Sequence, residues 1–407
     1  MKILLRIIVI DSALCPNFKM RNMDKKQAIA HSSIFLICCL LLLGFAGCAS
    51  KKTAFTPVDI IQADKVGQHD AMIASMINRY QLPAIQIAYT QSGKLTELHG
   101  GHDSFERIIP ISADHLLHAG SGTKLFTATV AMILLEQNKI TLEDTLSQWY
   151  PKFPNSDRIT IRMLLNHTSG IENNFSDIWM LALSAMDANR KWSPDEIFDR
   201  LYHKPLQFEP GERFAYASTN YLLLGAIFEK ITGLSLNLVY KHYLFDPLGM
   251  AHTYLPPFDD VTHIPRAGGL DIDYVPFGKR YMSPDETAWK TLSWAAGGCV
   301  STAKDMARFI DALFSYNIVK KQSLEQMLQF DADMSEDPRQ FVTGYGLGVA
   351  RYQFGKEQWY GHRGALMGWE SITLYNQKYE TGVAIIISKT KKKSDMFLIF
   401  SEVVDQL

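Results

Sequence analysis

Strand-forming sequence lies near both ends of the foldable part of this chain, and helix-forming sequence fills its middle. Residues 84–90 and 94–99 predict a hairpin, and residues 345–352, 370–376 and 382–388 predict strands close to the C-terminus. Late strands in quick succession favour antiparallel pairing. We therefore expect an α/β fold in which one antiparallel sheet, built from both ends of the chain, is flanked by helices and carries an inserted, mostly helical region.

The predicted helices follow from apolar residues that recur at helical spacing. They cover residues 70–80, 121–137 and 220–231, and an amphipathic stretch at 397–407 ends the chain. The lysine-rich run at 389–393 indicates a solvated turn.

The N-terminal region predicts an export signal rather than part of the folded body. Lys25 and Lys26 precede an uncharged apolar run at residues 34–46. This run is shorter than the roughly 20 residues that a membrane span needs, and it suits the apolar core of a secretory signal. It is followed by Gly47-Cys48, and small residues directly before a cysteine resemble a bacterial lipoprotein signal. An uncleaved anchor and ordinary signal cleavage nearby are the alternatives.

The lipoprotein interpretation divides the chain into a leader (residues 1–48), a tether (49–64) and one folded domain (65–407). Cys48 would carry the lipid and become the new N-terminus. The expected location is the bacterial cell envelope, with the protein attached to the membrane by this lipid and facing the periplasm.

Composition excludes several classes of function. The net charge of −1 gives no basic surplus for a nucleic-acid partner. Of the 5 cysteines only Cys299 lies in the predicted domain, so no disulfide can form within it. His115 and His118 are three apart, but no acidic or Cys ligand completes a recognisable metal-binding pattern around them, and we expect neither a metal nor another cofactor.

Ser121 and Lys124 form the first candidate pair for chemistry. At the start of a helix their side chains lie on one face, roughly 5–6 Å apart at Cβ. Free N–H groups at a helix N-terminus favour a developing oxyanion, and a desolvated lysine can take the serine proton. Alone, the S-x-x-K pattern is weak, because an N-capping serine with a solvent-facing lysine explains it equally well.

Two further elements carry polar groups at predicted turns. Tyr216, followed by Ser218, directly precedes the helix predicted at 220–231, so its hydroxyl can point toward another helix end. Residues 361–364 (Gly-His-Arg-Gly) lie between strand candidates, where closely spaced glycines let the backbone approach a ligand. Taken singly, a half-buried tyrosine and a surface β-turn are the simpler interpretations.

In combination these elements resemble the serine β-lactamase and penicillin-binding-protein superfamily, and specifically its class C branch. That branch includes D-Ala-D-Ala carboxypeptidases, D-aminopeptidases and esterases. Residues 65–405 carry S-x-x-K, a Tyr-containing motif and an H-x-G motif in the family's order, and class A enzymes carry a related set of motifs. Supporting stretches that also look like the family are LLNHTSG at 164–170, FEPGER at 208–213, FDPLGM at 245–250, AAGG at 295–298 and STAKD at 301–305.

The resemblance implies a role for each residue. Ser121 would attack the carbonyl carbon, and Lys124 and Tyr216 would pass its proton to the leaving group; which of the two is the base stays open, because they would titrate as a unit. The backbone N–H groups of Ser121 and Ala365 would form the oxyanion hole. His362 would lie beside the site, where it would polarise the Tyr216 hydroxyl or bind substrate.

Two positions depart from the family pattern. Ser218 replaces the usual Asn two residues after the tyrosine, and offers a shorter reach to a substrate amide. His362-Arg363-Gly364 replaces Lys-Thr-Gly, which argues against efficient β-lactam hydrolysis. Arg363 would either bind a substrate carboxylate or point into solvent.

The resemblance therefore implies a serine hydrolase that forms an acyl-enzyme on a small-molecule or peptide substrate. D-amino-acid peptides or β-lactams are the expected substrates, as in a D,D-carboxypeptidase. A lipoprotein esterase of the same fold and a catalytically silent, penicillin-binding-like scaffold are the alternatives. The oligomeric state is left open.

Overall fold

The computed structural model describes residues 68–407 except 92, 105–108, 275–277, 331–340 and 392–393. The leader, the tether and the predicted lipid site Cys48 lie outside the described residues. The division of the chain at residues 48 and 64 therefore stays a prediction.

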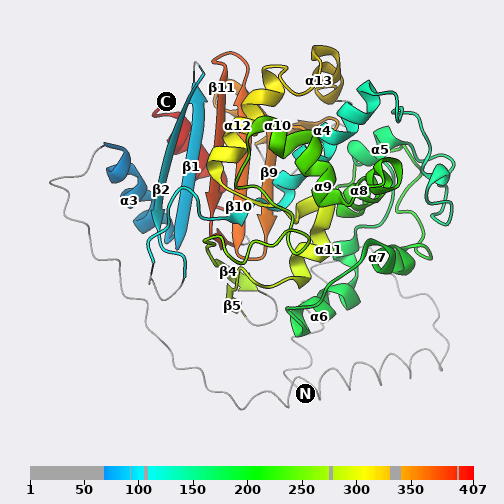
Figure 1. Ribbon diagram of the computed structural model, residues 1–407, viewed down its shortest axis with the longest axis horizontal. Helices are drawn as coiled ribbons and strands as arrows, with labels where there is room; N and C mark the ends of the chain where they lie inside the picture. Colours follow the sequence, from blue (N-terminus) through cyan, green and yellow to red (C-terminus); the bar gives the residue numbers. More distant parts are fainter. Residues whose placement is uncertain (1–67, 92, 105–108, 275–277, 331–340, 392–393) are drawn as a thin grey trace, which may run out of the picture. The chain divides into compact units, whose positions relative to one another are not determined.

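A seven-stranded antiparallel sheet joins the two ends of the described chain, as the sequence predicts (Figure 1). Its order is β2-β1-β11-β10-β9-β8-β7. The strands are β1 Ala84–Gln91, β2 Lys94–Gly101, β7 Val342–Tyr345, β8 Ala350–Phe354, β9 Glu357–Leu366, β10 Trp369–Asn376 and β11 Thr381–Ile387. The pairing of β1 with β11 closes the fold and confirms the predicted fold class.

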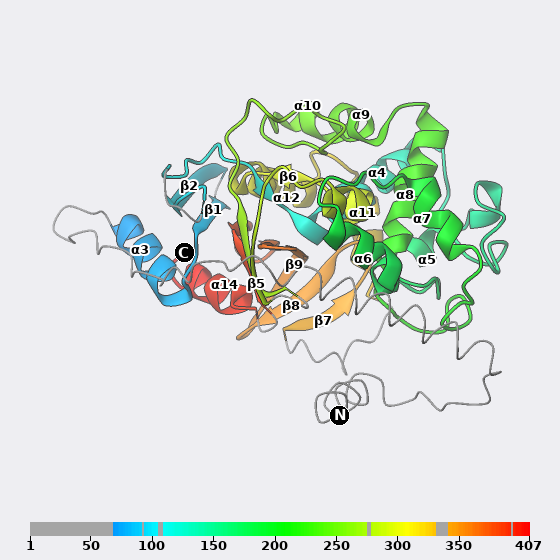
Figure 2. The same cartoon turned by 90° about the horizontal axis from the view of Figure 1, so that it is seen from below.

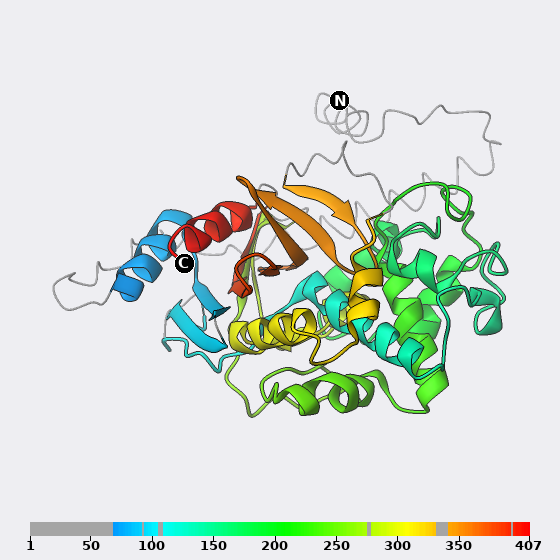
Figure 3. The ribbon, with the colours of Figure 1, turned by 90° about the horizontal axis from the view of Figure 1, so that it is seen from above.

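Both faces of this sheet are covered, which explains the apolar runs in its central strands. On one face, α3 (Gln68–Tyr80) and α14 (Met396–Val404) lie side by side, and Ile85, Ile385 and Phe400 belong to the same core cluster (Figures 2 and 3). On the other face, α12 (Ala303–Phe314) packs against β1 and β11.

The inserted region is mainly helical, as expected. It lies on the far side of α12 and α4 (Thr123–Glu136) from the sheet. Its helices are α5 Ile161–Leu165, α6 Ile178–Met186, α7 Pro194–Leu201, α8 Ser218–Thr232, α9 Leu236–Tyr240, α10 Asp246–Leu248 and α11 Ala288–Gly297. A three-stranded sheet, β12-β4-β5, contains β4 Gly269–Tyr274, β5 Gly278–Met282 and β12 Lys389–Thr390. The remaining elements are η2 Gly120–Gly122, η3 Leu146–Gln148, η4 Asn174–Ser176, η5 Lys241–Phe245, α13 Lys321–Met327, β3 Leu117–His118 and β6 Val300–Ser301.

Three local predictions were wrong. Residues 345–352 are not one strand, because a glycine turn separates β7 from β8 and Gly348 takes a φ of +80° against α4. Residues 361–364 lie inside β9 rather than between strands. Lys389 is buried rather than solvated, and its ammonium donates to the carbonyl of Tyr80.

Within the described part of the chain, no single helix is long and apolar enough to cross a membrane. One bent pair, Ser218–Thr232 with Leu236–Leu248, meets the requirement by length and composition alone.

Candidate active site

Ser121 lies in η2, the turn that leads from β3 into α4, and not in the first turn of α4 itself. Gly120 precedes it with a φ of +50°, a conformation that glycine adopts without a steric cost. A Cβ atom on Gly120 would come within 2.7 Å of the backbone nitrogen of Ala365. Gly364 is equally restricted, because its Cβ would lie 2.0 Å from the carbonyl oxygen of Ala119. Two glycines therefore let β9 and η2 touch, and this contact places Ser121 beside Ala365.

Lys124 follows one turn later and points back toward Ser121. Its Nζ lies 3.3 Å from Ser121 Oγ, 2.8 Å from the carbonyl oxygen of Ala296 and 3.5 Å from Ser218 Oγ. The side chain is fully buried. The sequence prediction of a Ser121–Lys124 pair is thus matched by the geometry.

The environment of Lys124 favours its neutral form. Burial holds the pKa of its ammonium group well below the usual 10.5. No carboxylate of the described chain forms an ion pair with it. A neutral amine has two N–H donors and one lone pair, so it can donate to Ala296 and Ser218 and still accept the proton of the Ser121 hydroxyl.

Tyr216 lies directly before α8, with its ring beside the same lysine. The Lys124 Nζ is 4.7 Å from the centroid of the Tyr216 ring. On its other side Tyr216 packs on His167, with ring centroids 4.3 Å apart. His167 is fully buried, and its Nδ1 accepts the backbone N–H of Ala217 at 3.2 Å. His167 therefore fixes both the ring of Tyr216 and the peptide that follows it.

His362 lies on β9 and its tautomer follows from its partners. Its Nδ1 is 2.6 Å from the carbonyl oxygen of Arg363, which can only accept, so Nδ1 carries the proton. Its Nε2, 3.0 Å from the Tyr345 hydroxyl, is then the acceptor. The His362 and Tyr216 rings are 6.1 Å apart between centroids. His362 thus lies beside the site as the sequence predicts, and it is a neighbour of Tyr216.

Ala365 lies at an open edge of the sheet. β8 pairs with β9 only as far as Gly361, and no strand in the described ranges pairs with 362–366 on that side. The backbone N–H of Arg363 faces this edge, because it donates to the Tyr352 hydroxyl at 2.9 Å. N–H groups two residues apart on a strand point the same way, so the N–H of Ala365 also faces the edge. It is available for the predicted oxyanion role.

Arg363 has a partner within the protein rather than pointing freely into solvent, and its binding of a substrate carboxylate stays a prediction. Its guanidinium forms an ion pair with Glu370 on β10, at 2.5 Å, and it also lies 5.5 Å from the centroid of the Phe397 ring. Glu370 is 2% exposed. The charge of Arg363 is therefore compensated inside the protein.

Ser218 begins α8, at the position where the family motif has Asn. Its backbone N–H donates to Asn173 Oδ1 at 3.1 Å, and its hydroxyl approaches Lys124. Asn173 precedes η4 and lines the same cavity as Ser121 and Ser218. An amide side chain is thus present beside the site, although it comes from a different segment of the chain.

The cleft around Ser121 has two lobes. The smaller lobe, about 130 Å³, is lined by Tyr216, Tyr345, His362 and Arg363 together with Ser121. The larger lobe, about 360 Å³, is lined by Ser121, Asn173, Ser218, Asp271, Ala365 and Met367, among others. Ser121, Tyr216 and Ala365 border both lobes, so a substrate bound across the cleft would present its middle to the serine.

Sequence reasoning missed His167, Tyr345 and Asp271 as residues of the site. His167 stands in the HTSG stretch noted for its family resemblance, and Tyr345 was placed in the wrong strand. Asp271 lies on β4, which was not predicted; alternating apolar residues after Gly268-Gly269 were the available signal. Trp289 and Trp294 are buried in the core rather than in the cleft.

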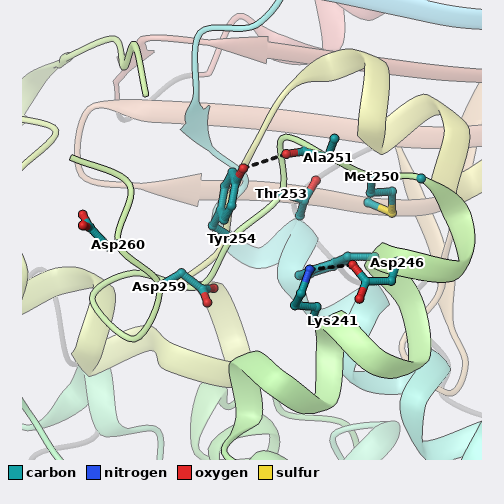
Figure 4. A pocket seen from close by; sticks show the side chains of 10 residues that line it. Lys241, Asp246, Met250, Ala251, Thr253, Tyr254, Asp259 and Asp260 are labelled. Atoms are coloured by element: carbon teal, nitrogen blue, oxygen red, sulfur yellow. Dashed lines mark hydrogen bonds and ion pairs between the residues drawn. The ribbon is translucent and has the colours of Figure 1, made fainter. Parts of the chain in front are cut away.

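Another pocket is lined by residues of η5, α10 and the segment that follows them, from Lys241 to Asp260 (Figure 4). Its lysine, Lys241, is ion-paired with Asp246 at 2.6 Å, and the Tyr254 hydroxyl donates to the carbonyl of Ala251. Asp259 accepts backbone and side-chain N–H groups from Leu255 and Asn237. This pocket pairs no serine or cysteine with a base. Across the described ranges, no group of three or more His, Cys, Asp or Glu side chains could hold a metal ion.

A family model described as "Beta-lactamase" matches residues 69–403. The chain belongs to the β-lactamase family. This confirms the resemblance inferred from the S-x-x-K, tyrosine and H-x-G motifs.

Named relatives of this β-lactamase-family chain include Penicillin-binding protein 4* of Bacillus subtilis, 30% identical over 53% of this chain and 49% of the relative. A β-lactamase of Providencia stuartii is 25% identical over 60% of this chain and 58% of the relative. The chain thus spans about half the length of these curated relatives.

Solved structures of the same fold cover most of the chain. The D-amino acid amidase from Ochrobactrum anthropi SV3 matches with a TM-score of 0.73 and 23% identity, over 83% of this chain and 96% of the amidase. An octameric penicillin-binding protein homologue from Pyrococcus abyssi matches with a TM-score of 0.70 and 24% identity, over 84% of this chain and 77% of the homologue. At these identities the likeness establishes the fold.

The contact between β9 and η2 generates a prediction. Gly364→Ala should lower the free energy of unfolding by about 1–3 kcal/mol, because the new methyl group overlaps Ala119 O and Ser371 Oγ. It should also slow the reaction of Ser121 with a fluorophosphonate, since β9 must move away from Ser121. Gly355→Asn is the control, because open space surrounds that glycine and Asn tolerates its φ of +57°. Equal effects of the two variants on urea unfolding and on rate would contradict this account.

Proposed function

We propose that this protein is a serine hydrolase in which Ser121 forms an acyl-enzyme and Lys124 removes the serine proton. The observation that carries this proposal is a fully buried lysine, without an ion-pair partner in the described chain, 3.3 Å from a serine hydroxyl. β-Lactamase-fold relatives of this chain are serine hydrolases, which supports the same reaction class.

Groups of this chain can accept and return every proton that moves during acylation. Ser121 Oγ forms a bond to the substrate carbonyl carbon while its proton moves to Lys124 Nζ. The carbonyl oxygen becomes an oxyanion, which the N–H groups of Ser121 and Ala365 stabilise by about 2.7–4 kcal/mol per donor in comparable sites. When the C–N or C–O bond breaks, the departing atom takes a proton through Lys124 and Tyr216. Water then cleaves the serine ester by the same steps in reverse order.

Tyr216 supports this proton transfer because of its position. Its ring borders both lobes of the cleft, lies over Lys124 and packs on His167. Lys124 and Tyr216 would share one proton, so their titration belongs to the pair. His362 holds the carbonyl oxygen of Arg363 with Nδ1 and the Tyr345 hydroxyl with Nε2, so both of its ring nitrogens are engaged beside Tyr216.

Peptides that contain D-amino acids are the proposed substrates. The expected envelope location would bring the enzyme close to cell-wall peptides, and the named relatives include a penicillin-binding protein and a D-amino acid amidase. Release of D-alanine from a D-Ala-D-Ala peptide, absent in Ser121→Ala, is the expected result. Hydrolysis of simple esters without any D-alanine release would support the esterase instead.

Attachment to the membrane through a lipid on Cys48 is a separate proposal, and it rests on the sequence of the leader. Expression of the full chain in a Gram-negative host should yield protein in the membrane fraction that gains the mass of the lipid, and Cys48→Ser should lose both properties. A soluble, unmodified full chain would overturn it.

The pKa of Lys124 predicts how the reaction depends on pH. Because the lysine must be neutral, kcat/KM should rise with pH through its folded-state pKa, which lies well below 10.5, and then level off. Lys124→Arg should lose about 10²–10⁴-fold in kcat/KM, because a guanidinium stays protonated.

Lys290→Arg is the matched control, because Lys290 is also buried and its pKa is lowered to about 8, but it does not line the cleft. The control should lose stability without losing the rate of the folded fraction. An unchanged pH profile in Lys124→Arg would refute the role of Lys124 as base.

A further inference from the structure

The charges that line the cleft are few and unequally compensated. In the larger lobe Asp271 is the charged side chain among the lining residues that the structure describes. It lies on β4, is 8% exposed, and forms no ion pair within the described ranges. In the smaller lobe the charge of Arg363 is cancelled by Glu370. The larger lobe therefore has a carboxylate without an ion-pair partner in the described ranges. In the smaller lobe the charges of Arg363 and Glu370 cancel each other.

Neighbouring cations are engaged elsewhere. Arg280, the cross-strand partner of Asp271 on β5, pairs with Glu286 at 3.0 Å. Lys391 pairs with Asp395 at 2.7 Å, and the ammonium of Lys389 donates to the carbonyl of Tyr80.

The carboxylate of Asp271 is held in place by groups that do not cancel its charge. Its Oδ1 accepts the backbone N–H of Asp273 at 3.0 Å, and the Thr390 hydroxyl also donates to it. Burial raises the pKa of Asp271, and the like charge of Asp273 acts in the same direction. A cation bound in the lobe would relieve both effects.

The two lobes have different places in the proposed reaction. Ser121 and Tyr216 border both lobes, so the two parts of a substrate that flank its carbonyl group fill one lobe each. The smaller lobe, about 130 Å³, suits a small leaving group, so the acyl part of the substrate occupies the larger lobe, about 360 Å³, with Asp271. β4 contacts the β9–β10 turn, where Leu270 N donates to Gly368 O. Leu366 pairs with Trp369 across this turn, so Gly368 lies roughly 7 Å beyond Ala365 along the strand direction.

We propose that Asp271 binds a primary ammonium group carried on the acyl part of the substrate, so that the enzyme prefers cationic acyl groups over neutral or anionic ones. This inference rests on the proposed acyl-enzyme reaction and adds a substrate class to it. The spacing favours an ammonium several bonds away from the scissile carbonyl rather than directly next to it.

A structural role for Asp271 alone is separable from this proposal. Its hydrogen bond to Asp273 N stabilises an irregular stretch of β4, where the pairing with β5 shifts register. An Asn side chain can accept the same N–H group through its amide oxygen. Asp271→Asn therefore removes the charge while it keeps the local hydrogen bond.

The test uses p-nitrophenyl esters of unbranched acids with a terminal amine, from glycyl to 6-aminohexanoyl, each beside its N-acetyl derivative. The wild-type protein should prefer the free amine by about ten- to hundredfold in kcat/KM at the best chain length, as expected for a charge-assisted hydrogen bond. Asp271→Asn should reduce that ratio to near one. Asp273→Asn, an exposed neighbour, is the matched control and should keep most of the preference.

The outcomes separate the two proposals. If p-nitrophenyl butyrate is not hydrolysed, or if Ser121→Ala hydrolyses it equally well, the acyl-enzyme proposal fails. If hydrolysis depends on Ser121 but the free amines and their acetyl derivatives react alike at every length, the ammonium site is refuted. A preference that persists in Asp271→Asn also refutes it.

Discussion

The contact between β9 and the η2 turn is the constraint on which the site depends. Gly364 and Gly120 carry no side chains, so the strand that ends in Ala365 can lie against the turn that holds Ser121. That contact brings the serine hydroxyl and a strand N–H together, from segments far apart in the sequence. The sheet makes this possible because β1 and β11 join the two ends of the described chain. The helical insertion between these ends supplies Tyr216 and Ser218, at the start of α8.

The proposed chemistry depends on Lys124, which the protein buries without an ion-pair partner in the described ranges. An ammonium in this position would lose its hydration and gain no carboxylate, so the neutral amine is favoured. Two other charged side chains of the cleft differ in whether they have an ion-pair partner. Arg363, which is 24% exposed, forms an ion pair with the buried Glu370, whereas Asp271 lines the larger lobe without an ion-pair partner in the described ranges. The absence of an ion-pair partner in the described ranges thus underlies both the proposed role of Lys124 as base and the proposed substrate preference of Asp271.

Much of this arrangement could be predicted from the sequence, and the errors have physical causes. Strand and helix periodicity located the sheet and α8, and motif order brought Ser121, Lys124, Tyr216 and His362 together. Periodicity could not divide 345–352, since the turn there depends on how Gly348 packs against α4. The partner of Arg363 lies on the neighbouring strand, so no local pattern reveals it. Asp271 matters only because a short, unpredicted strand brings it to the cavity that Ser121 also lines.

The central claim is that Ser121 becomes covalently acylated. Intact-mass spectrometry of residues 51–407, incubated with a fluorophosphonate and separately with a penicillin, tests it most directly, with Ser121→Ala as the reference. The account predicts one fluorophosphonate adduct per chain that is absent from Ser121→Ala; a penicillin adduct that persists would further indicate a penicillin-binding peptidase. No adduct from either reagent, or an adduct that Ser121→Ala retains, would contradict the account and favour a binding protein without catalytic activity.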